Sequence, residues 1–188
     1  MNVVIFDLEF TAWEGTLERN WSDPDEYREV VHIGAITVNS ETLKEEEECS
    51  IFVTPTINPQ LSLYFTELTS ITQQQVDAAG VSFKDAIAEL HTFTNDAPIY
   101  SWGDDAAVLR ENCELHTVGF PFNDGQFFDM RDVFIKQGVD AHAYSSSTIP
   151  QAFDMQNPYK SHNALNDARS ILLGVTQLPN NPFQSPTS

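Results

Sequence analysis

Short apolar runs alternate with amphipathic stretches along the chain, and this pattern predicts strands interleaved with helices. Val3 to Phe6 is an apolar, β-branched run, typical of a strand that is buried on both faces. The runs Val30 to Val38 and Ser50 to Val53 flank the charged, turn-forming stretch Asn39 to Glu48, which predicts a hairpin. The glutamates Glu45 to Glu48 are interpreted as the solvated tip of that hairpin.

Helix signals dominate the second part of the chain. Ser82 and Asp85 form a capping box ahead of an apolar stripe at helical spacing, so a helix is expected there. The further elements are expected in this order: a strand at Ile99 to Trp102, a helix at Asp104 to Cys113, a strand at Gln126 to Asp129, a helix around Val133 and a helix at Ala164 to Val175. This order of elements predicts an α/β sheet with helices on its faces.

The length of 188 residues suits one domain with one buried core, which we expect to span residues 1–178. The stretch from Pro179 to Ser188 is rich in Pro, Asn and Ser and is predicted to be a disordered tail. No stretch approaches the roughly 20 consecutive apolar residues of a membrane-spanning helix, and the N-terminus lacks a secretory pattern. A cytoplasmic protein without membrane association is therefore expected. The cysteines Cys49 and Cys113 lack zinc-site spacing and are assigned no function.

The net charge limits the kind of partner. Nine Lys and Arg stand against 28 Asp and Glu, giving −19. This is the opposite of the basic footprint of a protein that holds long nucleic acid through its phosphates. It is compatible with binding a few nucleotides at a chain end, where divalent metals meet the phosphate charge. The charge also leaves open an acidic cation-binding domain with no role in nucleic-acid binding.

Two acids follow the first predicted strand. Side chains two apart on a strand share a face, so Asp7 and Glu9 point the same way. Their repulsion and burial would raise at least one pKa unless a cation or solvent screens them. Hard carboxylate oxygens favour Mg²⁺ or Mn²⁺. The alternative is an ordinary solvated strand end.

A histidine and an aspartate mark the start of the last predicted helix. His162 and Asp167 are five residues apart, which on a continuous helix rotates them by about 140° and separates their faces. His162 is therefore expected before the helix, with Asn163 as N-cap and Asp167 near the helix start. There the imidazole could approach a metal-bound water while the aspartate holds the metal. The alternative is a surface or capping histidine.

Three motifs resemble, in order and spacing, those of the DnaQ-like DEDDh exonucleases: FDLEF at Phe6 to Phe10, SWGDDAAVL at Ser101 to Leu109, and HNALNDA at His162 to Ala168. Two more segments resemble the branch of the inhibitor-of-RNA-interference and histone-mRNA exonucleases: VVHIGAITV at Val30 to Val38 and LTSITQQQVDAAGVSF at Leu68 to Phe83. The resemblance spans about Val3 to Val175, nearly the whole chain.

The resemblance implies a ribonuclease-H-like fold, which is a five-stranded mixed sheet flanked by helices. It also implies two divalent metal ions, Mg²⁺ or Mn²⁺, and 3′-to-5′ hydrolysis of terminal phosphodiesters that releases nucleoside 5′-monophosphates. Carried over residue by residue, the metal ligands are Asp7, Glu9, Asp167 and a fourth acid, and the general base is His162. The fourth acid is expected to be Asp105 rather than Asp104, because in the family a leucine follows it four positions later, as Leu109 follows Asp105.

Residues after the first motif are expected to contact the terminal nucleotide: Phe10, Thr11 and Trp13. An aromatic ring can stack on any base without reading sequence. Asp129 has a counterpart in the family without a metal role, and a structural role at a strand end is expected for it. The alternative function is a catalytically inactive nucleic-acid-binding or scaffold protein of the same fold. The sequence leaves open RNA or DNA, a short or single-stranded substrate, and a homodimer.

Overall fold

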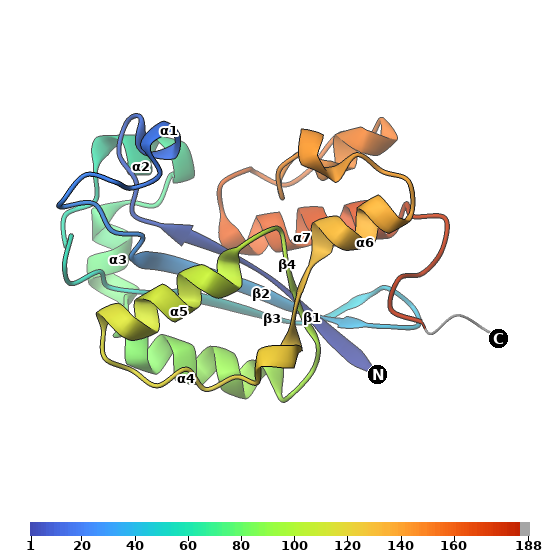
Figure 1. The fold of residues 1–188 in the computed structure, drawn as a ribbon, viewed down its shortest axis with the longest axis horizontal. Helices are drawn as coiled ribbons and strands as arrows, with labels where there is room; N and C mark the ends of the chain where they lie inside the picture. The colour runs from blue at the N-terminus through green and yellow to red at the C-terminus, as the bar shows by residue number, and fades with distance from the viewer. Residues whose placement is uncertain (185–188) are drawn as a thin grey trace.

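Five strands form one mixed sheet in the computed structural model, which describes residues 1–184 apart from the side chain of Asp124 (Figure 1). The strands are β1 (Asn2–Phe10), β2 (Val30–Asn39), β3 (Glu45–Phe52), β4 (Ile99–Ser101) and β5 (Phe127–Asp129). Their order across the sheet is β3-β2-β1-β4-β5. The neighbours β1, β2 and β3 run antiparallel, whereas β4 and β5 run parallel to β1. The predicted mixed sheet of five strands is confirmed.

Helices cover both faces of this sheet. The α-helices are α1 (Thr16–Arg19), α2 (Leu63–Thr69), α3 (Gln73–Ala79), α4 (Phe83–Thr94), α5 (Asp105–Leu115), α6 (Met130–Lys136) and α7 (Ala164–Val175). Single 3₁₀ turns are η1 (Asp124–Gln126), η2 (Ala141–Ala143) and η3 (Ile149–Phe153). Figure 1 shows α4 and α5 on one side of the sheet and α6 and α7 on the other.

Alternation along β1 assigns its side chains to the two layers. Phe6 and Leu8 belong to the core under α4 and α5, while Val3 and Ile5 belong to the core under α6 and α7. Because every second residue shares a face, Asp7 and the residues two positions from it point to the α7 side. The acids of the first motif thus lie where β1 leaves the α6–α7 core.

A glycine lets α7 approach the sheet closely. Gly34 of β2 pairs with Asp7 of β1. A Cβ atom at position 34 would lie 2.0 Å from the backbone nitrogen of Leu165 and 2.2 Å from the carbonyl carbon of Ala164. The first turn of α7 therefore rests on the bare backbone of β2, next to the strand position that carries Asp7.

Two parts of the fold differ from the sequence-based expectation. The glutamates interpreted as a hairpin tip belong to β3, where Glu48 pairs with Ile36 and Glu45 with Val38. They are exposed because β3 lies at the edge of the sheet, so the strand tolerates charge there. The helices α2 and α3 were not expected, because each buries only one or two side chains and shows no apolar stripe.

The end of the chain contacts the folded body. Asn181 donates a hydrogen bond from Nδ2 to the carbonyl oxygen of Ser40 over 2.8 Å. The ring centroids of Phe183 and Tyr100 lie 5.0 Å apart. Part of the segment predicted as a disordered tail therefore contacts the folded body, and its last four residues, 185–188, lie outside the described range. Within residues 1–184, no helix has the length and apolar character needed to cross a bilayer.

Candidate active site

Three carboxylates meet at the end of β1. Asp7 and Glu9 come from β1 and Asp167 from the first turn of α7, and one oxygen of each lies within 4.8 Å of the others. All three residues are buried, with exposed fractions of 7%, 8% and 3%. Among the described residues this is the one cluster of three or more acidic, histidine or cysteine side chains with such spacing.

Local sequence explains how α7 delivers its acid. Asn163 is the N-cap, and its side chain accepts a hydrogen bond from the amide of Asn166, as expected. Asp167 then lies one turn into the helix, near the positive end of the helix dipole. The contact between Gly34 and Leu165 fixes this turn against the sheet. Any side chain at position 34 would push Asp167 away from Asp7.

Burial and mutual repulsion raise the pKa values of these carboxylates. Burial raises the pKa of Asp7 well above its usual value, and repulsion from Asp105, Asp167 and Glu9 raises it further. A side-chain hydrogen bond with Ser146 acts in the opposite direction. The pKa of Glu9 is raised by burial and by the same neighbouring acids. Burial raises the pKa of Asp167 to about 7.

The cluster fits divalent cations. Glu9 Oε1, Asp167 Oδ1 and Asp105 Oδ2 are buried oxygens without a hydrogen-bond partner in the protein. A buried polar atom without a partner is costly, and a cation would both satisfy these oxygens and remove the repulsion between the acids. All the donors are carboxylate oxygens, which are the ligands that Mg²⁺ and Mn²⁺ prefer.

Asp105 faces this cluster from the start of α5, outside the group of three. Its charge contributes to the raised pKa of both Asp7 and Glu9, and burial raises its own pKa to about 8. Asp104, in contrast, is exposed and precedes the helix. Of the two neighbouring acids, Asp105 is thus the one whose charge acts on the three-carboxylate cluster.

His162 stands before α7, as the spacing of the motif predicted. Its backbone is left-handed, with φ 58°, and its amide donates a hydrogen bond to Asp167 Oδ2 over 3.1 Å. The imidazole reaches the wall of a pocket that also includes Glu9. Partial burial lowers the pKa of His162, which favours the neutral ring. A neutral imidazole next to a buried acid cluster can accept a proton.

The pocket beside His162, which we call the terminal pocket, is largely apolar and has a volume of about 170 Å³. Its walls include Phe10, Trp21, Tyr64 and Leu68. The rings of Phe10 and Trp21 lie 5.4 Å apart, and the Trp21 indole donates a hydrogen bond to the carbonyl oxygen of Thr11 over 2.9 Å. The pocket thus offers flat aromatic surface directly beside the carboxylates.

The three residues expected to bind substrate lie in different surroundings. Phe10 lines the terminal pocket. Thr11 is 2% exposed, and its hydroxyl donates to the carbonyl of Tyr27 over 2.5 Å and accepts from the amide of Glu29. Its side chain therefore supports the neighbouring segment. Trp13 is absent from the described residues that line this pocket, and its amide binds the Thr16 hydroxyl.

Asp129 has the structural role that was expected for it. It is the N-cap of α6, and its Oδ1 accepts hydrogen bonds from the amides of Arg131 and Gly103. Burial acts to raise its pKa, but the hydrogen bonds from Arg131 outweigh burial and lower it. Both carboxylate oxygens of Asp129 therefore accept hydrogen bonds within the protein.

Sequence reasoning missed several contributors to the site. Ser146 lies in an irregular segment, and nothing in its spacing links it to Asp7. Trp21, Tyr64 and Leu68 enter the terminal pocket from α2 and from the segment after α1. Trp21 could have been noticed as an aromatic residue in a polar stretch, but its partner elements are distant in sequence.

Comparison with known proteins agrees with this geometry. The sequence profile of the Exonuclease family matches residues 4–173. The 3′-5′ exonuclease Snipper of Drosophila melanogaster is 36% identical over 194 residues, covering 90% of this chain and 66% of that relative. The Bacillus subtilis protein named "Probable 3'-5' exonuclease KapD" is 30% identical over 139 residues, covering 72% and 62%. The chain thus spans about two thirds of these relatives.

Solved structures show the same fold. One is the nuclease domain of 3′hExo, a DEDDh family member, bound to rAMP; the TM-score is 0.79 at 22% identity, with 94% of this chain and 92% of that chain covered. Another describes 3′-end specific recognition of the histone mRNA stem-loop by a 3′-exonuclease, with a TM-score of 0.80, 22% identity and coverage of 94% and 81%.

Proposed function

Because this chain belongs to the Exonuclease family, we propose that it is a metal-dependent 3′-to-5′ exonuclease that releases nucleoside 5′-monophosphates. One observation carries the proposal. Buried carboxylates with unpartnered oxygens lie beside an aromatic pocket, and His162 stands at the boundary between them. This arrangement offers adjacent places for a scissile phosphate and for a terminal base.

Asp7, Glu9, Asp167 and Asp105 would hold the divalent ions, Mg²⁺ or Mn²⁺. When bound, such ions lower the pKa of water and offset the negative charge that develops on the phosphate and on the departing 3′ oxygen. The protein supplies the negative charge that attracts them and the buried setting that strengthens the interaction. The charges of Asp105, Asp167 and Glu9 all act on Asp7, so Asp7 is the acid that we expect to be shared between the ions.

His162 would accept the proton of the attacking water at its side-chain nitrogen. Its lowered pKa keeps the imidazole neutral near pH 7, as a general base requires. The terminal base would enter the pocket formed by Phe10, Trp21 and Tyr64, where stacking is tolerant of base identity. That the similar nuclease domain of 3′hExo was solved with rAMP supports a mononucleotide site in this fold.

We further propose that the substrate is short or single-stranded at its 3′ end. The net charge of −19 makes a long contact with a phosphate backbone unfavourable. The choice between RNA and DNA depends on contacts to the 2′-hydroxyl. The digestion described next decides that choice, and a homodimer and a cytoplasmic location stay predictions.

The test is a digestion of matched 5′-labelled RNA and DNA oligonucleotides of several lengths with Mg²⁺, with products identified by mass. We expect a ladder that shortens from the 3′ end, release of 5′-monophosphates, and complete inhibition by EDTA. Asp7→Asn serves as the inactive control. Binding without hydrolysis at any length would instead support the alternative, a nucleic-acid-binding or scaffold protein that keeps the fold.

A further inference from the structure

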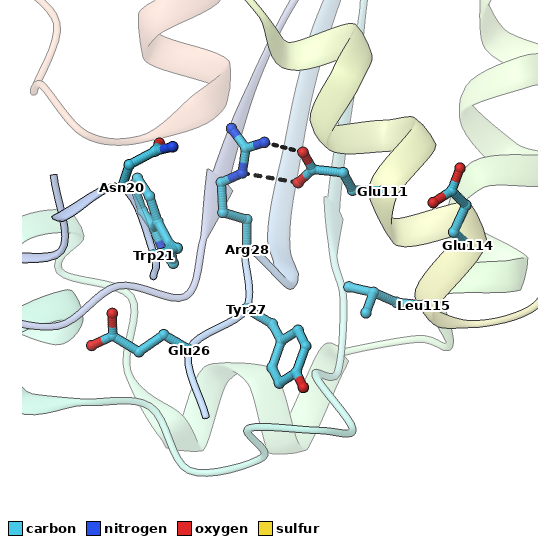
Figure 2. A pocket seen from close by; sticks show the side chains of 8 residues that line it. All are labelled: Asn20, Trp21, Glu26, Tyr27, Arg28, Glu111, Glu114 and Leu115. Carbon is cyan, nitrogen blue, oxygen red and sulfur yellow. Dashed lines mark hydrogen bonds and ion pairs between the residues drawn. The ribbon is translucent and has the colours of Figure 1, made fainter. Parts of the chain in front are cut away.

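A second pocket adjoins the terminal pocket, and the proposed mechanism does not use it. This adjoining pocket has a volume of about 350 Å³, within the range of roughly 300–1,000 Å³ of small-molecule sites. It lies between the segment after α1 and the C-terminal half of α5 (Figure 2). Its principal side chains are Trp21, Tyr27, Arg28, Glu26, Glu111 and Glu114.

Trp21 forms part of both pockets, so a strand that fills the terminal pocket is led toward the adjoining one. The ring centroids of Phe10 and Trp21 lie 5.4 Å apart, and the guanidinium carbon of Arg28 lies 5.9 Å from the centroid of the Trp21 ring. The indole thus contacts an aromatic ring of the terminal pocket and lies near a cation of the adjoining pocket. An indole beside a guanidinium is a surface on which a base can stack and a phosphate can pair.

Arg28 is held in place by its backbone, while its side chain stays partly exposed. Its carbonyl oxygen accepts a hydrogen bond from buried Asn112 over 2.7 Å, and Asn112 also accepts from the amide of Val30. The guanidinium donates to both oxygens of Glu111, from Nε over 2.9 Å and from Nη2 (Figure 2).

Two of the three glutamates at the adjoining pocket have a cationic partner while the site is empty. Glu111 is paired with Arg28, and Glu26 accepts hydrogen bonds from Arg19. Two of the nine basic residues of this acidic chain are thus placed at or next to this pocket. The pair is partly open to solvent, and a phosphate would offer Arg28 the same bidentate set of acceptor oxygens that Glu111 offers now.

We propose that the adjoining pocket binds the nucleotide that precedes the 3′-terminal one, with its base on Trp21 and its phosphate on Arg28. This inference rests on the proposed exonuclease function. Glu111 holds the guanidinium in position while the site is empty, and the phosphate takes its place when a strand binds.

The experiment compares two substrates of the same enzyme. The p-nitrophenyl ester of thymidine 5′-monophosphate has only a terminal nucleotide, whereas a trinucleotide also fills the adjoining pocket. We expect Arg28→Ala to lower the ratio of kcat/KM for the trinucleotide to that for the ester by about tenfold, the loss of one charged hydrogen-bonded contact. Lys84→Ala, which removes an exposed charge on α4, is the matched control and should leave this ratio unchanged.

Glu111→Gln provides an independent readout through binding. It keeps the side-chain volume but frees Arg28 from a carboxylate, so in an Asp7→Asn background the trinucleotide should bind more tightly by a few-fold, measured by anisotropy. The inference is overturned if Arg28→Ala lowers kcat/KM equally for the ester and the trinucleotide. It is also overturned if Glu111→Gln leaves the affinity for the trinucleotide unchanged. Tighter binding of a basic peptide than of a trinucleotide to this pocket also overturns it. Absence of hydrolysis of the ester and of both RNA and DNA trinucleotides by the unaltered protein refutes the exonuclease function itself.

Discussion

The backbone amide of His162 donates a hydrogen bond to Oδ2 of Asp167, over 3.1 Å. The proposed general base therefore orients a proposed metal ligand through its main chain, and its imidazole is left for other contacts. Because His162 adopts φ 58°, the amide turns toward α7 while the side chain reaches the terminal pocket. A substitution of the side chain should therefore remove the proposed general base and keep the hydrogen bond from the amide to Asp167.

His162→Ala should separate the two roles of this residue. Loss of a general base typically lowers the rate by about 10²–10⁴-fold, and we expect a fall in kcat of that order. The amide contact to Asp167 remains, so Mg²⁺ should raise the melting temperature of the variant as much as that of the unaltered protein. A loss of the Mg²⁺-induced shift would mean that the imidazole itself contributes to metal binding.

Neutralising a ligand should abolish catalysis without unfolding the protein. For Asp7→Asn and Asp167→Asn we expect undetectable hydrolysis, because an amide binds Mg²⁺ poorly. Melting temperatures without metal should be unchanged or raised, since the pKa of both acids is raised by burial and the charge is unfavourable. As a contrast, Asp129→Asn should lower the melting temperature, because it removes the charged partner of Arg131. Near wild-type turnover in either ligand variant contradicts the metal assignment.

The neighbouring acids of the second motif should respond differently. Asp105→Ala removes the buried carboxylate that faces Asp7, and activity should fall by several orders of magnitude. Asp104→Ala changes an exposed residue and should cost little activity. Single-turnover rates at saturating Mg²⁺ measure both. The reverse pattern would move the fourth ligand by one residue.

Stability without metal should fall as the pH rises. Burial raises the pKa of Asp105 to about 8 and that of Asp167 to about 7, above unfolded values near 4. The folded protein then holds protons that the unfolded chain has released, so its stability decreases from about pH 4 upward and reaches its low plateau above about pH 8.

Mg²⁺ should reverse this trend, because it binds the ionised acids and competes with protons. We expect the Mg²⁺-induced rise in melting temperature to be clearly larger at about pH 8.5 than at about pH 5.5. Thermal scans with EDTA or excess Mg²⁺ over this range measure it. Equal shifts at both ends would show that the carboxylates are ionised throughout.

Binding of nucleic acid should depend weakly on salt. Few basic side chains are available to displace counterions, so the slope of log affinity against log salt should be shallow. Affinity of the Asp7→Asn variant, measured with Mg²⁺ over a salt series, should level off within a few nucleotides. A steep slope, or affinity that keeps rising with length, would reveal a basic track that the net charge conceals.

Sequence predicted the parts of the site that depend on spacing. The alternation along β1 was enough to put Asp7 and Glu9 on one face, and the five-residue interval put His162 ahead of α7. The walls of the pockets could not be predicted, because Trp21 and Tyr64 meet only through the tertiary fold. Arg28 gave no signal either, since its contacts to Glu111 and Asn112 span more than eighty residues.

The four glutamates of β3 also decide how copies of this protein can meet. An edge strand presents backbone groups that another strand can pair with, and many proteins assemble or aggregate in this way. Two copies joined through β3 would set Glu45 to Glu48 of one against the same row of the other, and like charges opposite each other destabilise a sheet. Arg169 lies against Glu45 and Glu48, and Glu46 accepts hydrogen bonds from Asn2 and Asn39, but the row keeps an excess of negative charge. At neutral pH this charge disfavours pairing of β3 with the β3 of a second copy, so we expect an association of two copies to use another surface.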